Sequence, residues 1–303
     1  MSLKSAAVLV AIVCLYFSPT LLHAEPGTVQ KLAPGVYVWQ GDRDKREPAN
    51  CTWIIFKDYV VVIDANFPWG AREIIPKIKE TTDKPIRFVL NTHYHSDHSY
   101  GNSLFTDLGA IIINSEDTDR EARTNATGWT KWNDPAHSLE GAHLEFATIT
   151  FSDRLVLDDG TQRVEMIHLG PAHSKGDAVA YLPREKILAT GDLCVTWGFG
   201  NNVGDPNANY AGWLSALDRM SAWDPKTVVP GHGAVSGPEA LRAQHEYLAG
   251  MLKQVQDGMR AGKTADQLAT ELDLRSYGFI ANNAPANATS IRNMYKHLAG
   301  GAP

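Results

Sequence analysis

The sequence has little cysteine and no excess of positive charge. Only three of its 303 residues are cysteines, so the chain permits few disulfide bonds. Its 28 basic and 34 acidic residues give a net charge of −6. Nucleic acids and anionic membranes are bound through basic surfaces, and this acidic balance therefore argues against both as the main partner. The length is ample for a well-buried core, in one large domain or two small ones.

The apolar stretch near the N-terminus is too short to cross a bilayer. Residues 6–17 are twelve in number, whereas a transmembrane helix needs about 20. Lys4 precedes this stretch and Ala24 offers a small residue for cleavage, which is the order of a signal peptide. We therefore expect residues 1–24 to be removed. The mature chain, beginning at Glu25, is predicted to be periplasmic or secreted and to have no membrane span.

Removal of the signal peptide would leave Cys51 and Cys194 as the remaining cysteines. An oxidising compartment would permit one disulfide bond between them, but their separation in the sequence says nothing about their geometry. Two buried free thiols are the more usual outcome, and we expect that outcome here.

Three of the eleven histidines are concentrated beside one aspartate. His93, His95, Asp97 and His98 fall within six positions, directly after residues 86–90, whose bulky apolar side chains predict a buried strand. Imidazole and carboxylate are the ligands that suit zinc and neighbouring transition metals. The strand therefore leads into a loop of metal-ligating side chains, which can surround more than one ion.

Further histidine and aspartate residues follow predicted strands in the second half of the chain. They are His173 after a strand at 163–169, Asp192 after 186–189 and His232 after 227–229. Ligands that are far apart in sequence can thus converge on one edge of the sheets. The remaining pattern predicts strands at 36–39, 51–56, 59–63, 110–114, 148–152, 155–157 and 178–182, and helices at 69–82, 104–108, from 115, and at 210–221, 239–259, 264–272 and 289–298.

Two loops without regular periodicity are candidates for covering a site. Residues 41–50 are predicted to form a charged hairpin or flap. Residues 128–135 carry two tryptophans among turn-forming residues. This second loop either closes over a pocket as a lid or is anchored by its tryptophans, and the sequence leaves both alternatives open.

The order of these residues resembles that of the metallo-β-lactamase superfamily. The family motif H-x-H-x-D-H stands at residues 93–98. It is followed by a histidine in a G-x-x-H loop, an aspartate at a Gly-Asp strand end and a histidine after glycine, which are His173, Asp192 and His232. The similarity extends over residues 29–235, and all seven residues occur in the family's order.

This resemblance implies an α/β fold, the αββα sandwich in which two mixed sheets face each other with helices outside. The two strand-rich halves of the sequence agree with that architecture. We expect residues 25–236 to form the metallo-β-lactamase-like catalytic domain. Helical periodicity from residue 237 onward predicts that residues 237–303 are a C-terminal helical extension of the same domain.

The resemblance also implies roles for the seven residues. One metal ion would be held by His93, His95 and His173, the other by Asp97, His98 and His232, with Asp192 bridging both. Two zinc ions are expected, although iron and manganese accept the same ligands. Two close divalent ions acidify a shared water, so that a metal-bridging hydroxide would attack the substrate. Asp97 is the expected catalytic residue, which orients this hydroxide or takes a proton.

Residues near the motif are interpreted by the same resemblance. Asp64 matches an aspartate that receives an N–H from a ligand histidine. Asn66 stands where the family usually has glycine, and asparagine tolerates the left-handed conformation that the turn needs. Tyr100 stands where the family often has glycine and would bring an aromatic ring near the pocket. Neither His168 nor Cys194 is expected to be a ligand.

The leading interpretation is a secreted or periplasmic dinuclear hydrolase of a small amide or ester, with a β-lactam as the first candidate. Arg43, Lys45 or Arg46 on the flap would bind a substrate carboxylate. A glyoxalase II-like thioesterase and a lactonase have the same ligands and remain alternatives. A di-iron oxidoreductase is disfavoured, because that branch has glutamate at the position of His93. A non-catalytic metal-binding protein is disfavoured because the ligand set is complete, and a nuclease is disfavoured by the acidic charge and the signal peptide. The sequence indicates no oligomeric state.

Overall fold

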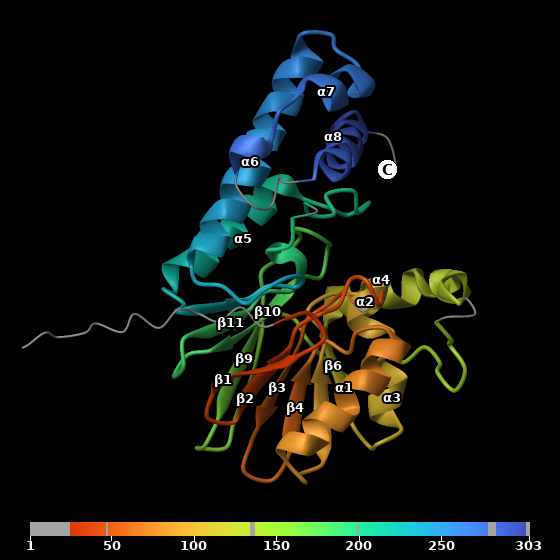
Figure 1. Ribbon diagram of the computed structural model, residues 1–303, viewed down its shortest axis with the longest axis vertical. Coiled ribbons are helices and arrows are strands. Elements are labelled where there is room, and N and C mark those ends of the chain that lie inside the picture. The colour runs from red at the N-terminus through yellow and green to blue at the C-terminus, as the bar shows by residue number, and fades with distance from the viewer. Residues whose placement is uncertain (1–24, 47, 134–136, 199, 278–282, 301–303) are drawn as a thin grey trace, which may run out of the picture.

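Two β-sheets packed face to face form the centre of the molecule (Figure 1). The computed structural model describes residues 25–300 apart from 47, 134–136, 199 and 278–282. Helices pack on the outer faces of both sheets, so the layers follow in the order helix, sheet, sheet, helix. The expected αββα sandwich is therefore confirmed. The predicted signal peptide, residues 1–24, lies outside the described residues.

The first sheet contains seven strands in sequence order. Its first four strands are antiparallel, and the fourth to the seventh are parallel. Both faces of this sheet are covered, which explains why its fourth strand is apolar throughout instead of alternating. The strands are β1 (Val29–Ala33), β2 (Val36–Trp39), β3 (Cys51–Ile55), β4 (Val60–Ile63), β5 (Ile86–Leu90), β6 (Ile111–Ser115) and β7 (Ile149–Phe151).

The second sheet has five strands in the order β12-β11-β10-β9-β8. Four of them are antiparallel neighbours, and β12 joins β11 in parallel. The parallel pair matters for the site, because the loops that leave its two carboxyl ends start side by side. The strands are β8 (Arg154–Asp158), β9 (Arg163–His168), β10 (Ala178–Leu182), β11 (Ile187–Ala189) and β12 (Thr227–Val229).

The helices are distributed along the whole chain. They are α1 (Pro68–Thr81), α2 (Ser96–Ser99), α3 (Asn102–Thr106), α4 (Glu116–Thr124), α5 (Tyr210–Ala222), α6 (Glu239–Arg260), α7 (Ala265–Glu271) and α8 (Ala284–Leu298), with the 3-10 turns η1 (Ala126–Trp132) and η2 (Gly191–Leu193). Among the described residues, none of these helices is both long and apolar enough to cross a membrane.

Three apolar clusters hold the layers together. Side chains such as Val36 and Met166 fill the space between the two sheets. On the outer face of the first sheet, Ile74 and Ile78 of α1 are four positions apart, so they share one helix face and pack against the strands. Helices α5 and α6 cover the second sheet through a third cluster, which includes Trp213. The sandwich is thus apolar in its interior, and its polar site residues lie in loops.

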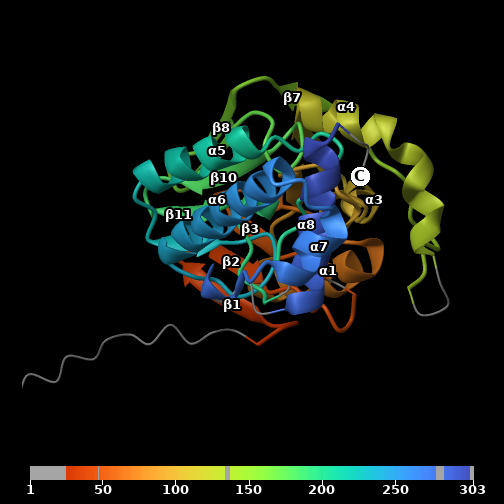
Figure 2. The same ribbon diagram turned by 90° about the horizontal axis from the view of Figure 1, so that it is seen from above.

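Helices α6, α7 and α8 rise beyond the sheets (Figure 1), and the view from above shows α6 running beside α5 over the second sheet (Figure 2). Tyr247, Leu248 and Met251 of α6 are fully buried in the same cluster as α5. Ile291 and Met294 of α8 belong to that cluster too. The C-terminal helices therefore share a core with the second sheet instead of forming one of their own.

The structure differs from the sequence-based expectation at several elements. The sequence does not predict β1, where Gln30 and Lys31 interrupt the apolar pattern, because an outermost strand needs little burial. Helix α8 begins at Ala284, before its predicted start, because Asn283 caps the N–H of Ala286. The two described cysteines are buried free thiols, as expected.

Candidate metal centre

The histidine motif lies at the carboxyl end of β5. The chain passes through His93 and His95 and then enters α2, which contains Asp97 and His98. Asn91 closes this turn by donating from its side-chain amide to the carbonyl of His98 at 3.1 Å. His93 and His95 fall in one group of neighbouring ligand atoms, and Asp97 and His98 fall in another. The sequence predicts a loop here, and the short helix is the element that separates the two groups.

The other three predicted residues come from loops of the second sheet. His173 follows β9, Asp192 lies in η2 after β11, and His232 follows β12. Ala189 lies opposite Val229 in the parallel pair, so the loops bearing Asp192 and His232 leave the sheet together. The structure brings the seven predicted side chains into two groups. Within each group, the possible ligand atoms all lie within 4.8 Å of one another.

Asp192 lies between the two groups. Its Oδ2 is 3.5 Å from His173 Nε2 and 3.9 Å from His93 Nε2. Its Oδ1 is 3.1 Å from His232 Nε2 and 3.3 Å from His98 Nε2. Each carboxylate oxygen thus faces one group, which is the arrangement that a bridging carboxylate requires.

The first group, His93, His95 and His173, directs imidazole nitrogens toward a common centre. His95 Nδ1 and His173 Nε2 are 3.1 Å apart. His95 Nε2 donates to the carboxylate of Asp205 at 2.9 Å, which leaves the electron pair on Nδ1. His93 Nε2 is buried and has no hydrogen-bond partner among the described residues. An unsatisfied buried polar atom costs about 1–3 kcal/mol, and a transition metal ion would satisfy this one, so the residues fit such an ion.

The second group, Asp97, His98 and His232, is oriented by other partners. His232 Nδ1 donates to the carbonyl of Pro48 at 2.8 Å, so its Nε2 carries the electron pair. His98 Nδ1 lies 2.9 Å from Asp64 Oδ2 and is oriented in the same way. The two Nε2 atoms are 3.4 Å apart, and Asp97 Oδ2 is 3.4 Å from that of His232. This donor set of two imidazoles and a carboxylate also fits a divalent transition metal.

The two groups differ in protonation. Burial, followed by neighbouring imidazoles, lowers the pKa of His93 well below its usual value and that of His173 to about 4. Burial acts on His98 and His232 too, but nearby carboxylates, Asp192 first, outweigh it and raise both pKa values. Burial would likewise raise the pKa of Asp192, yet these imidazoles hold it well below its usual value. His93 and His173 are thus ready to bind a metal, whereas His98 and His232 must first release protons. His95 is the exception in the first group, because burial lowers its pKa but the hydrogen bond to Asp205 outweighs burial and raises it.

The loop after β4 supports the second group. Asp64 and Asn66 both adopt left-handed backbone conformations, with φ of 61° and 56°. The backbone N–H and the hydroxyl of Thr92 donate to the two carboxylate oxygens of Asp64 at 2.7 and 2.8 Å. The Asn66 side chain donates to the carbonyl of Ala49 at 2.7 Å, which ties this turn to the end of the flap. The predicted left-handed turn at Asn66 and the predicted contact of Asp64 with a motif histidine are confirmed.

Sequence reasoning misses three partners of the site residues. Thr92 and Asp205 belong to no motif, and the acidic side chain of Asp205 in the loop between η2 and α5 is the one signal that could have pointed to it. Pro48 acts through its backbone carbonyl, which leaves no signal in the sequence. His168 lies outside both groups and faces a backbone carbonyl, in agreement with the prediction that it is not a ligand. Cys194 also lies outside them, and burial raises its pKa, which keeps the thiol neutral.

A cleft of about 440 Å³, the motif cleft, opens on one side of Asp97. Tyr94, Tyr100 and Lys131 contribute to its lining. The aromatic ring expected near the pocket is therefore present at Tyr100. Trp129 packs against Tyr100 with ring centroids 4.7 Å apart, so the predicted lid loop is anchored by this tryptophan while Lys131 lines the cleft.

A second cleft of about 620 Å³, the flap cleft, opens on the other side of Asp97. Arg43 and Arg46 line it, as does Trp197. The Trp197 ring stacks on that of His232 at 4.2 Å with 9° between the planes, and Arg43 lies 5.9 Å from the Trp197 ring. A cationic and aromatic wall therefore adjoins the second group.

A family model described as the metallo-beta-lactamase superfamily matches residues 44–232. The chain is 25% identical over 211 residues to the 2,4-dinitroanisole O-demethylase subunit alpha of Nocardioides sp. (strain JS1661), covering 69% of this chain and 58% of that protein. It is 26% identical over 253 residues to the linear primary-alkylsulfatase of Pseudomonas sp. (strain ATCC 19151), covering 67% and 46%. It is 24% identical to the metallo-beta-lactamase type 2 of Elizabethkingia meningoseptica, covering 67% and 78%. The chain thus spans about half the length of the first two relatives.

Two solved structures share the fold. The metallo-beta-lactamase from Pontibacter korlensis superposes with a TM-score of 0.60 at 23% identity, covering 73% of this chain and 98% of that one. The stereoselective inverting sec-alkylsulfatase Pisa1 from Pseudomonas sp. has a TM-score of 0.68 at 17% identity, covering 89% of this chain and 50% of that one. This second match covers 89% of the chain, whereas residues 1–236 make up less than four fifths of it. The match must therefore extend into the C-terminal helices.

Proposed function

The chain belongs to the metallo-beta-lactamase superfamily of metal-dependent hydrolases, and from this premise we propose that it is a dinuclear hydrolase of a small anionic amide or ester. The observation that carries the proposal is the position of Asp192, with one carboxylate oxygen facing each group of ligand atoms. Two ions that share one carboxylate lie close enough to act on a single bond.

The first group would hold one ion, the second group the other, and Asp192 both. The imidazole and carboxylate donors favour zinc, while iron and manganese accept the same set. When bound, the ions would polarise the bond under attack and lower the pKa of the attacking water. The contacts of Asp205, Asp64 and the Pro48 carbonyl orient the histidines, so that their free electron pairs would be available to the ions.

Asp97 is the residue to which we assign proton transfer. It lines both clefts, and its side chain is 20% exposed, so water and substrate can reach it. Its Oδ2, 3.4 Å from His232 Nε2, can accept a proton from the attacking water or orient that water. Asp192 is buried with both oxygens directed at imidazoles, which leaves it less free for this role.

The anionic part of the substrate would be bound in the flap cleft. Arg43 and Arg46 line this cleft, and a guanidinium group can hold a carboxylate or sulfate through two parallel hydrogen bonds. Trp197 offers a flat apolar surface for the body of the substrate. A β-lactam carboxylate fits this chemistry and is the first candidate, in line with the similarity to a metallo-beta-lactamase type 2.

A sulfate ester is the second candidate. It is favoured by the likeness to the sec-alkylsulfatase fold, which extends into the C-terminal helices, and by the sequence similarity to a linear primary-alkylsulfatase. A sulfate ester carries the same kind of negative charge for the flap arginines. A glutathione thioester is less favoured, because Arg260 and Lys263 of the C-terminal helices pair with Asp257 and Glu271.

One panel assay tests the proposal. The purified zinc-loaded protein is given a chromogenic cephalosporin, an alkyl sulfate, an acyl lactone and a glutathione thioester, with the His95→Ala variant and a chelator as controls. We expect cephalosporin turnover that is lost in both controls. Turnover of the sulfate alone would replace the first candidate by the second. If no substrate is cleaved faster than by His95→Ala, the hydrolase proposal is wrong for all four classes.

We also propose that the mature protein starts at Glu25 and is exported, on the charge and apolar order of residues 1–24. Residues 25–236 would be the catalytic domain and residues 237–303 an extension of it, because α6 and α8 pack into the cluster under α5. N-terminal sequencing of the protein from its native host tests export. An intact Met1 on protein in the cytosolic fraction would contradict it.

A further inference from the structure

Glu121 is a buried carboxylate outside both groups of the metal centre. It lies in α4, and only 5% of its surface is exposed. Within the described residues it has no ion-pair partner, whereas Asp117 and Asp119 of the same helix pair with arginines. A carboxylate is rarely buried without a cation, so its other contacts must account for its position.

Three N–H donors surround the Glu121 carboxylate. Oε1 accepts from the backbone N–H of Lys175 at 3.2 Å and from the side-chain amide of Asn207 at 2.9 Å. Oε2 accepts from the backbone N–H of Gly176 at 3.1 Å. Lys175 and Gly176 belong to the loop that carries His173, and Asn207 belongs to another loop. One side chain thus joins two loops more than 30 residues apart in the sequence, which also meet where the backbone N–H of Asn209 donates to the carbonyl of Ala172 at 2.7 Å.

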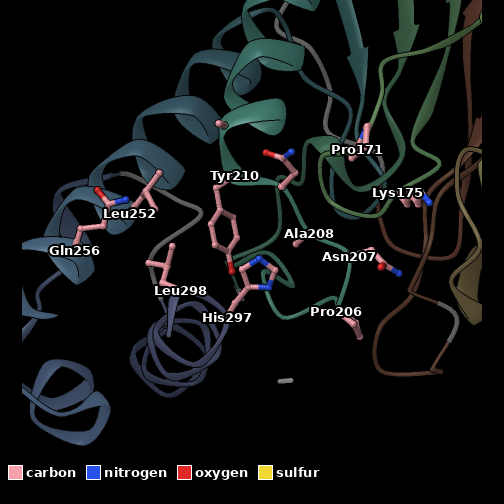
Figure 3. Close-up of a pocket in the computed structure, with 12 residues that line it drawn as sticks. Pro171, Lys175, Pro206, Asn207, Ala208, Tyr210, Leu252, Gln256, His297 and Leu298 are labelled. Atoms are coloured by element: carbon pink, nitrogen blue, oxygen red, sulfur yellow. The ribbon is translucent and has the colours of Figure 1, made fainter. Parts of the chain in front are cut away.

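The same two loops line a cleft of about 580 Å³ together with residues of α5, α6 and α8. Figure 3 shows Lys175 and Asn207 at one end of this cleft, with Tyr210 and His297 farther along it. Asn207 follows Asp205 by two residues, and the backbone N–H of Asn207 donates to Asp205 Oδ1 at 2.7 Å. The other oxygen of Asp205 holds His95. Two further hydrogen bonds, from Asn207 to Asp205 and from His95 to Asp205, therefore link the contact of Glu121 with Asn207 to a predicted ligand.

The loop of His173 is also fixed to α4 on its other side. The hydroxyls of Ser115 and Thr118 each donate to the carbonyl of Gly176 at 2.7 Å. A Cβ on Gly176 would lie 2.2 Å from the backbone nitrogen of Thr118, so only glycine allows this approach. The Gly176 residue is held at its carbonyl by two hydroxyls and at its N–H by Glu121. This leaves the loop little freedom to move relative to α4.

We propose that Glu121 is a positioning residue, which fixes the His173 loop and the Asp205 loop to each other and thereby sets the spacing of His173 and His95 in the first group. The inference rests on the proposed dinuclear function, because the spacing of these two nitrogens, 3.1 Å apart, matters only if they bind one ion. None of the hydrogen bonds described for Glu121 involves a residue of the second group.

A carboxylate suits this position better than an amide. Its two oxygens accept from three donors, whereas glutamine has one oxygen and an NH₂ group that would face a donor. Burial, followed by the charge of Asp205, raises the pKa of Glu121 to about 7, while the three donors act in the opposite direction. Burial thus disfavours the charge of Glu121, and the three N–H donors are the described contacts that favour its carboxylate form.

Cobalt binding to the metal-free full chain tests the proposal without relying on turnover. Cobalt(II) is titrated into the wild type and into Glu121→Gln and Glu121→Leu, and the absorption spectrum and the stoichiometry report the two sites separately. Glu116→Gln, an exposed change in the same helix, is the matched control. We expect Glu121→Gln to weaken the tighter-bound first ion about tenfold and Glu121→Leu more strongly, up to about a hundredfold, with the second ion changed by less than about twofold.

The turnover of the best substrate adds a second readout. For Glu121→Gln we expect kcat to fall with KM changed little, because the substrate-binding arginines lie elsewhere. Equal weakening of both ions, with a lower Tm, would mean a general structural role and overturn the proposal, as would wild-type cobalt binding in Glu121→Gln. If Glu121→Leu does not fold, Glu121→Gln decides alone. A wild type that binds no second ion would instead contradict the proposed dinuclear function.

Discussion

Asp192 lies between the two groups of the candidate metal centre, and these groups are held in place by different means. In the first group, His95 is oriented by Asp205, whose loop and that of His173 meet at Glu121. In the second group, His232 is oriented by a backbone carbonyl and His98 by an aspartate that follows a neighbouring strand. The first group therefore depends on side chains from distant loops, and the second depends on a backbone carbonyl of the flap and on an aspartate at the end of β4.

This difference extends to the charge of the histidines. His93 and His173 have lowered pKa values and are neutral near pH 7. The pKa values of His98 and His232 are raised by the carboxylates around them. A metal ion at the second group must therefore displace protons, whereas at the first group it meets two imidazoles that are already deprotonated. The two groups that face Asp192 thus differ in how many of their imidazoles hold a proton tightly, one in the first group and two in the second.

The largest effect is expected from Asp192→Ala, which removes the carboxylate that faces both groups. Activity should fall by at least about a thousandfold, because several kcal/mol of transition-state stabilisation by the ions would be lost. Metal analysis should show that both ions bind more weakly. Asp224→Ala, the same change at an exposed aspartate outside both groups, is the control and should leave turnover unchanged. If Asp192→Ala retained both ions, the two groups would not share a ligand.

Acidification should remove the second ion before the first. Because the metal-free pKa values of His98 and His232 are raised, protons compete for them from above pH 6.5 downward. In the first group only His95 has a raised pKa, while those of His93 and His173 are lowered, so protons compete there for one imidazole and in the second group for two. The measurement is the number of zinc ions per chain after dialysis at a series of pH values. A simultaneous loss of both ions, or loss of the first ion alone, would show that the charge difference is wrong.

Substituting the aspartate that orients a histidine should weaken only the ion bound by that histidine's group. We expect Asp205→Asn to weaken the first ion and Asp64→Asn to weaken the second, each by about 10- to 100-fold, the usual effect of losing such a contact. Asparagine keeps the shape, so folding should be preserved, which circular dichroism can check. Competitive titration with a chelating dye gives both affinities. If either variant weakened both ions to the same extent, the groups would be coupled more tightly than their separate hydrogen bonds indicate.

The smallest effect is expected at the flap cleft. Arg43→Ala should raise the KM of an anionic substrate by up to about fivefold with kcat unchanged, since an exposed ion pair contributes up to about 1 kcal/mol. Lys131→Ala in the motif cleft is the matched comparison, because both residues line clefts that open beside Asp97. A larger increase for Lys131→Ala than for Arg43→Ala would place the substrate anion on the side of the first group.

Much of the fold and of the candidate site can be predicted from the sequence. The residues of the motif stand next to one another after an apolar strand, and His173, Asp192 and His232 each follow a strand that ends beside the same site. Strand ends are readable because apolar patterns stop abruptly at a turn. The same pattern predicts most strands of both sheets.

The groups that orient the site residues are harder to predict. The Pro48 carbonyl belongs to the backbone and carries no residue-specific signal. Asp205 and Glu121 are single acidic residues whose partners lie in other loops, so only the folded structure shows that they meet His95 and Asn207. Edge strand β1 escapes prediction for a related reason, since its position in the sheet comes from pairing with β2 and not from its own pattern.

The number of metal ions per chain tests the central claim most directly. The metal-free protein is titrated with zinc at neutral pH, unbound metal is removed, and zinc and protein are measured by elemental and amino-acid analysis. Two groups of donors around Asp192 predict a plateau at two ions per chain. A plateau at one ion or fewer would contradict the shared dinuclear centre.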